Sequence, residues 1–442
     1  MTLDELRKLV ADGAVDTVLL GFCDMQGRLQ GKRLVADFFL EEIADHGAEG
    51  CNYLLAIDVD MNTVAGYAMS SWETGYGDFV LKPDLETLRM VPWHEATAMC
   101  MADITWHDDS AVTPSPRQIL RRQLERLEER GWIALAATEL EFILFRDTYE
   151  AAWRKGYRDL DPANYYNVDY SMLGTSRVEP LLGRIRREMA RTGLKVENSK
   201  GECNFGQHEI NFGYEPALGA ADTHTIYKNA AKEIASQEGM ALTFMAKFNE
   251  REGNSCHVHL SLREAGGGVL FGDQPELFDR FVAGQLACLR QLTLCLAPNV
   301  NSYKRYAQGS FAPTAVAWGH DNRTCALRVV GHGPSLRVEN RVAGGDVNPY
   351  LAIAAMIASG LHGIDNELPL EPAFEGNAYT ADKPQVPSTL LQARELFAAS
   401  DVAREAFGED VVAHYLNYAD VELRAFEAAV TDWEHVRGFE RL

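Results

Sequence analysis

Two glutamates within an apolar run have a spacing that could support a binding or catalytic site. Glu139 and Glu141 lie two positions apart in ATELEFILF, which spans residues 137 to 145. Alternate side chains of a strand point to alternate faces, so both carboxylates share one face while Leu140 and Phe142 take the other. Because an unpaired buried carboxylate is costly and two neighbouring ones repel each other, such a pair needs a partner that neutralises it.

Further segments carry charged residues at strand-like spacing. KGECNFGQHEINFGY and GNSCHVHLSL supply carboxylates and imidazoles, and SLRVENRV alternates charged residues with mostly apolar ones. NSYKRYAQGSFAP and DNRTCALRVV add arginines. The residues of interest in these segments are Glu202, Glu209, His257, His259, Ser261, Arg305, Arg323, Arg328, Arg337, Glu339 and Arg341.

Carboxylates with at most one imidazole suit a hard divalent cation, Mg²⁺ or Mn²⁺, better than a structural zinc. Such ions neutralise the carboxylates and leave coordination places for phosphate oxygens, while arginine binds phosphate and carboxylate through its planar fork. Acidic strands beside basic ones therefore predict phosphoryl transfer on an anionic substrate. The chain has no GxxxxGK[ST] loop, so metals and arginines would have to hold the nucleotide.

Each motif alone also has a simpler structural interpretation. An E-x-E pair in a strand is more often solvated or ion-paired, and H-x-H often marks histidines satisfied within the core. R-x-E-x-R could form a cross-strand ladder of salt bridges. Their joint occurrence favours a functional site, because packing does not explain an interior with so many charges.

The elements that must position these residues alternate irregularly between strands and helices. Short β-like runs dominate the first hundred residues, with one helix near 38–46, and Pro and Ser then open a helix that Gly131 closes. A further helix is expected over 222–240, and the pattern is helical from about Asn348 onward. We predict an α+β protein with domains at 1–107 and 108–442.

Composition excludes several classes of protein. There is no apolar run of membrane-spanning length, and the amphipathic start MTLDELRKLV does not resemble a signal peptide, so we expect a cytoplasmic protein without membrane association. A net charge of -22 argues against nucleic acid as a partner. The eight cysteines include no CxxC pair, so neither a zinc knuckle nor a disulfide framework is indicated.

The motif series resembles the glutamine synthetase family over nearly the whole chain. E-x-E, E-x6-E, H-x-H, N-R-x4-R and R-x-E-x-R, followed by N-P-Y, occur in the family's order and spacing. The resemblance implies a β-grasp-like N-terminal domain, a catalytic domain of curved antiparallel sheet with helices, and a homo-oligomer, which we expect to be a dodecamer. Its active sites would lie between one subunit's catalytic domain and a neighbour's N-terminal domain.

The resemblance also implies roles for individual residues. Two Mg²⁺ or Mn²⁺ ions would be held, the first by Glu141, Glu202 and Glu209 and the second by Glu139, His257 and Glu339. ATP would contact Glu197, Tyr214, His259, Ser261, Arg328 and Arg337, and L-glutamate would contact Arg305, Arg341 and the backbone around Gly253. Arg323 would stabilise the transferring phosphoryl group, and Asp58 would accept the proton of the attacking amine.

Two positions depart from the family's ammonium site. The serine position of the acidic-serine pocket is Met61, although Asp58 is retained, and the flap glutamate is replaced by Phe311. Glu252 also replaces the asparagine before Gly253. The apolar side chains of Met61 and Phe311 would contact the carbon atoms of an amine substrate. We therefore favour a ligase that joins glutamate to a small primary amine, ethanolamine first and a diamine or polyamine second. The alternatives are a glutamine synthetase that uses ammonia, a guanidino kinase and a catalytically inactive regulatory relative.

Overall fold

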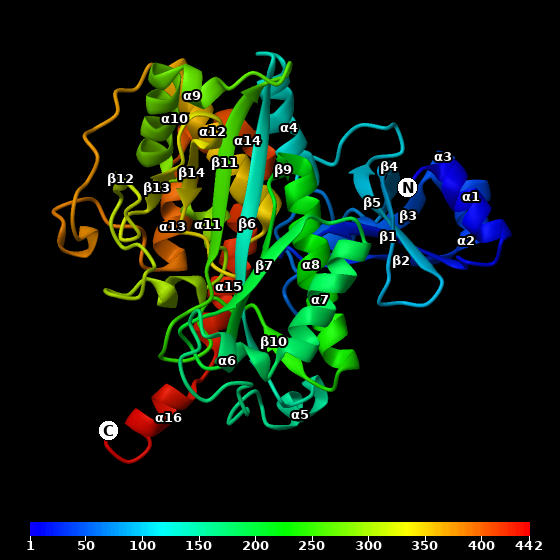
Figure 1. Ribbon diagram of the computed structural model, residues 1–442, viewed down its shortest axis with the longest axis horizontal. Coiled ribbons are helices and arrows are strands. Elements are labelled where there is room, and N and C mark those ends of the chain that lie inside the picture. Colours follow the sequence, from blue (N-terminus) through cyan, green and yellow to red (C-terminus); the bar gives the residue numbers. More distant parts are fainter.

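The protein, described over residues 1–442 by a computed structural model, contains two β-sheets surrounded by helices (Figure 1). The small sheet has the order β2-β1-β5-β4-β3, and the large sheet follows the path β12-β13-β14-β11-β6-β8-β7, with β9 and β10 also pairing with β6. The strands of the small sheet are β1 Thr17–Cys23, β2 Leu29–Val35, β3 Ala48–Cys51, β4 Asp78–Met90 and β5 Thr97–Thr105. Those of the large sheet are β6 Trp132–Phe145, β7 Val196–Gly201, β8 Gln207–Phe212, β9 Glu215–Pro216, β10 Ala241–Thr243, β11 Cys256–Glu264, β12 Trp318–His320, β13 Leu327–Val330 and β14 Arg337–Asn340.

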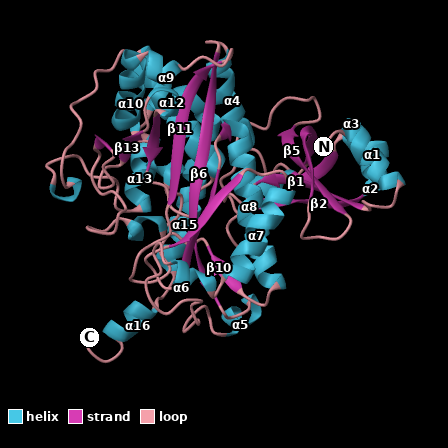
Figure 2. Cartoon of the chain, in the orientation of Figure 1, coloured by secondary structure: helices cyan, strands magenta, loops and turns pink.

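Helices cover both sheets, and the predicted α+β class is confirmed. Helix α8 contacts β6 of the large sheet and β2 of the small one, and so lies between them (Figure 2). The helices are α1 Leu3–Ala11, α2 Ala36–Phe38, α3 Ala44–His46, α4 Pro116–Glu128, α5 Tyr149–Arg154, α6 Met172–Ser176, α7 Glu179–Arg191, α8 Ala217–Gln237, α9 Leu270–Asp273, α10 Pro275–Cys288, α11 Thr293–Leu296, α12 Pro349–Asp365, α13 Leu390–Ala398, α14 Asp401–Phe407, α15 Glu409–Ala428 and α16 Asp432–Gly438. None of them combines the length and the apolar character that a bilayer-spanning segment needs.

The long strand β6 has the alternation expected from its sequence. Ala134, Ala136, Thr138 and Leu140 are buried on one side of the strand. The face that carries Glu139 therefore points away from the helices that cover the buried side. Helix α12 behaves differently, because almost all of its residues are buried, as expected for an apolar helix in the middle of a large core.

A largely buried ion cluster connects the small sheet to helices that pack between it and the large sheet. The guanidinium of Arg117, at the start of α4, donates to Asp103 on β5 at 2.6 Å and to Asp84 on β4 at 2.7 Å. It also binds Asp222 of α8 at 2.9 Å, and Tyr350 donates its hydroxyl to the same aspartate. Buried charges are tolerated when they are paired in this way. The cluster joins residues from both predicted domains, 1–107 and 108–442, so the domain boundary near residue 108 stays a prediction.

Several predicted boundaries differ from the observed ones. The helix expected from Asp222 begins earlier, at Ala217 directly after Pro216, and the Asp222 carboxylate lies within the helix, where it binds Arg117 of α4. The helical pattern expected from Asn348 is interrupted over 366–389, where prolines and a glycine prevent a continuous helix. The helix near 38–46 is present but includes a π-helical turn over Phe39–Ile43.

Candidate active site

Strand register brings the charged residues of the large sheet together. On the antiparallel strands β6 and β11, Glu139 lies opposite His257, and on β6 and β8, Glu141 lies opposite Glu209. Glu339 of β14 lies opposite His259 of β11. Residues paired in this way across antiparallel strands point to the same face with Cβ atoms about 5 Å apart. Residues more than a hundred positions apart in the chain therefore form one charged surface.

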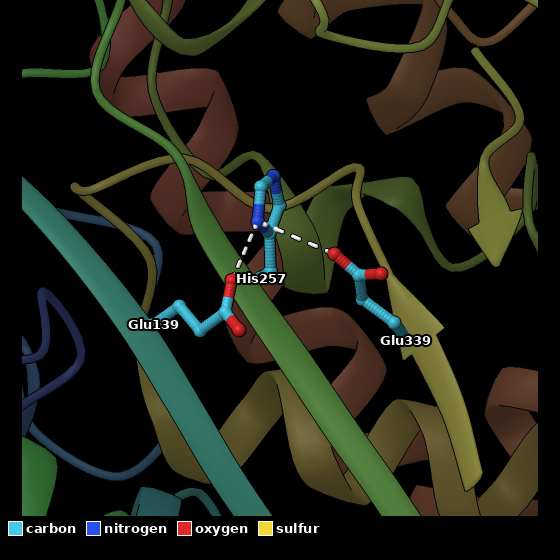
Figure 3. Close-up of side chains that lie close together, drawn as sticks. All are labelled: Glu139, His257 and Glu339. Atoms are coloured by element: carbon cyan, nitrogen blue, oxygen red, sulfur yellow. Dashed lines mark hydrogen bonds and ion pairs between the residues drawn. The ribbon is translucent and has the colours of Figure 1, made fainter. Parts of the chain in front are cut away.

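One group in this surface consists of Glu139, His257 and Glu339 (Figure 3). The Nδ1 atom of His257 lies 3.1 Å from Glu139 Oε2 and 3.4 Å from Glu339 Oε1. The side chains come from three neighbouring strands, and their candidate ligand atoms lie within 4.8 Å of one another. Two carboxylates and one imidazole are a donor set that suits Mg²⁺ or Mn²⁺.

Neighbouring cations keep the carboxylates of this group ionised. Burial alone would raise the pKa of Glu339, but the charges of His257, when it is protonated, and of Arg341 lower that pKa to about 2. Arg328 and Arg341 also donate to the two oxygens of Glu339 at 2.7 and 2.5 Å. Burial and the charge of Arg341 lower the pKa of His257, which favours the neutral imidazole that a metal requires.

The second group consists of Glu141, Glu202 and Glu209, whose candidate ligand atoms also lie within 4.8 Å of one another. Glu141 accepts hydrogen bonds from the backbone amide of Ser255 at 2.7 Å and from the side chain of Gln207 at 3.0 Å, which orient its carboxylate. Burial, together with the charges of Glu141 and Glu139, raises the pKa of Glu209 to about 8. Three carboxylates held together in this way fit a divalent cation, since the ion removes their mutual repulsion.

His259 connects the first group to the arginines. Arg337 donates from Nε to His259 Nδ1 at 3.2 Å, and His259 Nε2 lies 3.0 Å from Glu139 Oε1. Arginine can only donate, so Nδ1 must be the acceptor and the ring hydrogen sits on Nε2, from which it donates to Glu139. This tautomer fixes the orientation of the Glu139 carboxylate.

Two adjoining cavities are lined by residues of this charged surface. The smaller one, of about 320 Å³, is lined by five of the six residues expected to contact ATP, namely Glu197, Tyr214, His259, Ser261 and Arg337. The larger one, of about 690 Å³, is lined by both groups of candidate metal ligands and by Gly253, Phe311, Arg323, Arg328 and Arg341. Arg328 thus faces the larger cavity. Because Glu139 lines both cavities, the two meet at the candidate metal centre.

Comparison with known protein families agrees with the residues that line these cavities. The chain matches the family described as "Glutamine synthetase, catalytic domain" over residues 113–437. This chain belongs to the glutamine synthetase family. The predicted resemblance is confirmed, and divalent metals and ATP are used throughout this family.

Relatives within the glutamine synthetase family cover nearly the whole chain. A γ-glutamylethanolamide synthetase of Streptomyces coelicolor is 64% identical over 443 residues, covering 100% of this chain and 96% of that protein. A glutamate–isopropylamine ligase of a Pseudomonas species is 37% identical, covering 98% of this chain and 97% of that protein. The solved structure of a GmaS/ADP complex superposes with a TM-score of 0.87 at 27% identity, covering 98% of this chain and 99% of the other.

Three residues predicted from the family line neither of these two cavities. Asp58 and Met61 line neither cavity. Instead, the Asp58 carboxylate accepts from the backbone and side chain of Asn62, and the sulfur of Met61 accepts from Arg28. Arg305 is 2% exposed, and its guanidinium donates to backbone carbonyls of residues 341–343, so it supports the segment that carries Arg341.

The structure adds residues that the sequence reasoning missed. Asp169 and Tyr170, in a turn, and Met172, at the start of the short helix α6, line the larger cavity, although the sequence around them gives no periodic signal. Tyr170 and Phe311 share left-handed backbone conformations, with φ of 53° and 58°. Such conformations are unfavourable for large side chains and recur at functional sites. Lys200 was also missed, although it shares a strand-like stretch with Glu202 two residues later.

Proposed function

We propose that this protein is an ATP-dependent ligase that joins the γ-carboxylate of L-glutamate to a small primary amine through γ-glutamyl phosphate. The observation that carries the proposal is that both groups of candidate metal ligands and three arginines, Arg323, Arg328 and Arg341, line one cavity. Phosphorylation turns a poor electrophile into one with a leaving group. A site that holds phosphates and a carboxylate side by side suits that reaction.

The residues in and around the two cavities would have separate roles. Bound divalent ions, two in each site, would neutralise the phosphate charge during transfer. The smaller cavity would hold ATP against Glu197, Tyr214, His259, Ser261 and Arg337. Arg341 would bind a carboxylate of glutamate, with Arg305 holding the backbone behind it and Gly253 near the amino group. Arg323 makes no hydrogen bond or ion pair within the chain, so its guanidinium is free to meet the charge that develops on the transferring phosphoryl group.

The amine is proposed from the walls of its pocket. Phe311 is 57% exposed and lines the larger cavity, where it offers apolar surface to carbon atoms rather than a carboxylate to ammonium. The ethanolamide named for the Streptomyces coelicolor relative supports ethanolamine as the first choice. A diamine or polyamine is the second choice, and a glutamine synthetase that uses ammonia is the alternative function.

Assembly completes the proposed site. Asp58 and Met61 lie outside the two cavities of their own chain's candidate site, which supports a homo-oligomer, a dodecamer by family resemblance, in which a neighbour supplies them. Exposed apolar side chains, among them Phe38, Trp72, Val436 and Phe439, are also consistent with covered surfaces. Asp58 would then bind the alkylammonium and accept its proton before attack, because an alkylamine with a pKa near ~10.4 is almost wholly protonated at pH 7.

A coupled assay of ATP turnover with glutamate tests the proposed reaction. Ammonium, ethanolamine, putrescine, spermine and methylamine are compared by kcat/KM, with mass spectrometry identifying each γ-glutamyl product and Glu209→Ala as the inactive control. Ethanolamine should give the highest value. A wild type that prefers ammonium to every amine would make the protein a divergent glutamine synthetase, and turnover with none of them would favour an inactive relative.

Mixing two inactive variants tests the shared site. Asp58→Ala and Glu209→Ala subunits are dissociated together and reassembled. Hybrid sites with one intact half from each subunit should recover activity that neither variant has alone. No recovery from reassembled mixed oligomers would place Asp58 within its own chain's site.

A further inference from the structure

Lys200 supplies a cation inside the group formed by Glu141, Glu202 and Glu209. Its ammonium donates to Glu202 and lies 3.8 Å from Glu209 Oε1. It also lies 4.9 Å from the ring centroid of Tyr170, within the range of a cation–π contact. The Lys200 side chain is 22% exposed and lines the larger cavity. Its ammonium thus lies among carboxylates that a divalent ion would need.

The backbone, and not only a side-chain rotamer, places Lys200 there. In the pairing of β7 with β8, Lys200 lies opposite Glu209, which itself lies opposite Glu141 on β6. Lys200, Glu209 and Glu141 therefore form one row across three neighbouring strands, with all three side chains on the same face. Changing this arrangement would require a shift of register, which would move every side chain of β7 to the other face.

We propose that Lys200 is a built-in counter-cation of the first metal site. It neutralises part of the charge of Glu202 and Glu209 when no divalent ion is bound, and the ion displaces it on binding. The inference rests on the proposed assignment of Glu141, Glu202 and Glu209 as metal ligands. An ammonium supplies one positive charge to three carboxylates and a divalent ion supplies two, so the ion is the stronger partner and the lysine its tethered competitor.

Lys200 can leave the site without unfolding the strand. Its four-carbon stem is flexible, and the cavity beside it provides space for the ammonium to move away from the carboxylates. The group formed by Glu139, His257 and Glu339 has no lysine among its contacts; its cations are the arginines on Glu339. The two proposed metal sites should therefore differ, because only the first must displace a lysine to bind its ion.

Mn²⁺ titration followed by electron paramagnetic resonance tests this inference without any need for turnover. Lys200→Met removes the competing charge, Lys200→Arg keeps it, and Lys195→Met removes an exposed lysine just before β7. Lys200→Met should bind Mn²⁺ at the first site about tenfold more tightly, since a charge-assisted hydrogen bond no longer has to be broken. Lys200→Arg and Lys195→Met should remain within about twofold of wild type, the ordinary scatter for one contact.

Thermal unfolding gives a second readout. Without metal, Lys200→Met should have a lower Tm than wild type, because the carboxylates lose their counter-ion, and it should gain more than wild type when Mg²⁺ is added. Unchanged or weaker Mn²⁺ binding by Lys200→Met would overturn the role of the lysine. A Glu209→Ala variant that keeps the full number of Mn²⁺ sites would instead overturn the metal-site assignment, so the two failures are distinguishable.

Discussion

Glu141 and Glu209 lie directly opposite each other on the antiparallel strands β6 and β8, with both side chains on one face of the large sheet. Both are buried, and their mutual repulsion, after burial itself, contributes to the raised pKa of Glu209. Like charges directly opposite each other are normally avoided in sheets. The pair therefore destabilises the fold locally, and we infer that it is kept because it binds a cation.

Removing one charge of this pair should separate stability from function. Glu209→Gln keeps the size of the side chain, so above pH 8, where Glu209 of the metal-free protein is ionised, the variant should have a raised Tm because repulsion from Glu141 is lost. Activity should fall by more than about a hundredfold, since changes even in groups that orient metal ligands cost up to that much. Differential scanning fluorimetry and the coupled assay measure the two effects. Glu264→Gln, at an exposed position of β11, is the control, and a lowered metal-free Tm of Glu209→Gln would contradict this account.

The two cavity arginines should affect different kinetic constants. Arg341→Ala should raise the KM for glutamate, because a charge-assisted contact to a carboxylate is lost. Arg323→Ala should lower kcat by about a hundredfold with a smaller effect on KM, since it meets charge only as transfer proceeds. Initial-rate kinetics with glutamate and ATP varied separately distinguish these outcomes. If both variants changed only the KM for ATP, this division of roles would be wrong.

Arg341 has a second consequence that Arg323 does not share. Its guanidinium donates to Glu339, a proposed metal ligand, whereas Arg323 has no partner in the chain. Arg341→Ala should therefore also weaken Mn²⁺ binding, and Arg323→Ala should leave it unchanged. Mn²⁺ titration in the absence of substrate provides this comparison.

The amine preference should change with the apolar residues that replace the family's polar ones. Phe311→Glu combined with Met61→Ser should raise the ratio of kcat/KM for ammonium to that for ethanolamine. The two methylenes of ethanolamine, at about 0.8 kcal/mol each, correspond to roughly fifteenfold in that ratio. Met245→Ser, another exposed methionine, is the control. An unchanged ratio would show that these two positions do not determine the choice of amine.

His414 should make the fold sensitive to mild acid. Burial lowers the pKa of this α15 histidine from an ordinary 6.5 to about 4, so the folded protein holds it neutral. Below pH 6.5 the unfolded chain takes up a proton that the folded chain does not, and stability is lost progressively as pH falls from 6.5 towards 4. The loss attributable to His414 is roughly 3 kcal/mol.

Comparison with a variant isolates this effect. His414→Gln cannot titrate, so its Tm should fall less between pH 7 and pH 4.5 than that of wild type, even if its Tm at pH 7 is lower. His362→Gln, which changes a histidine near the end of α12, should follow the wild-type profile. Parallel curves for all three proteins would exclude His414 as a source of acid sensitivity.

Much of the site could be read from local sequence. Alternation in ATELEFILF, CHVHLSL and SLRVENRV assigns each charged residue to a face of its strand, because side-chain direction in a strand depends only on position parity. Met61 and Phe311 were identified as departures without any structure. Helix α4 also begins where its proline and serine predict, since both residues act through local backbone geometry.

Other features depended on partners distant in the chain. The helix expected to begin at Asp222 begins at Ala217, and the Asp222 carboxylate binds Arg117 and Tyr350 from within α8. Arg305 reads as a substrate contact, yet it is buried, and its Nη2 donates to the carbonyls of residues 341–343 while its Nη1 donates to Ser255. Both depend on side chains that reach the same point only after folding, which local propensity cannot encode.

The sequence by itself determined which residues carry charge, which face of each strand they occupy, and the family to which their order belongs. Only the tertiary structure decided their pairing, in which Glu139 meets His257 and Lys200 meets Glu209. It also placed Asp58 outside the two cavities of its own chain's candidate site. The physical reason is that strand alternation is a local property of the backbone. Strand order and register, in contrast, follow from how the whole core packs, and they set which charges must share one small volume.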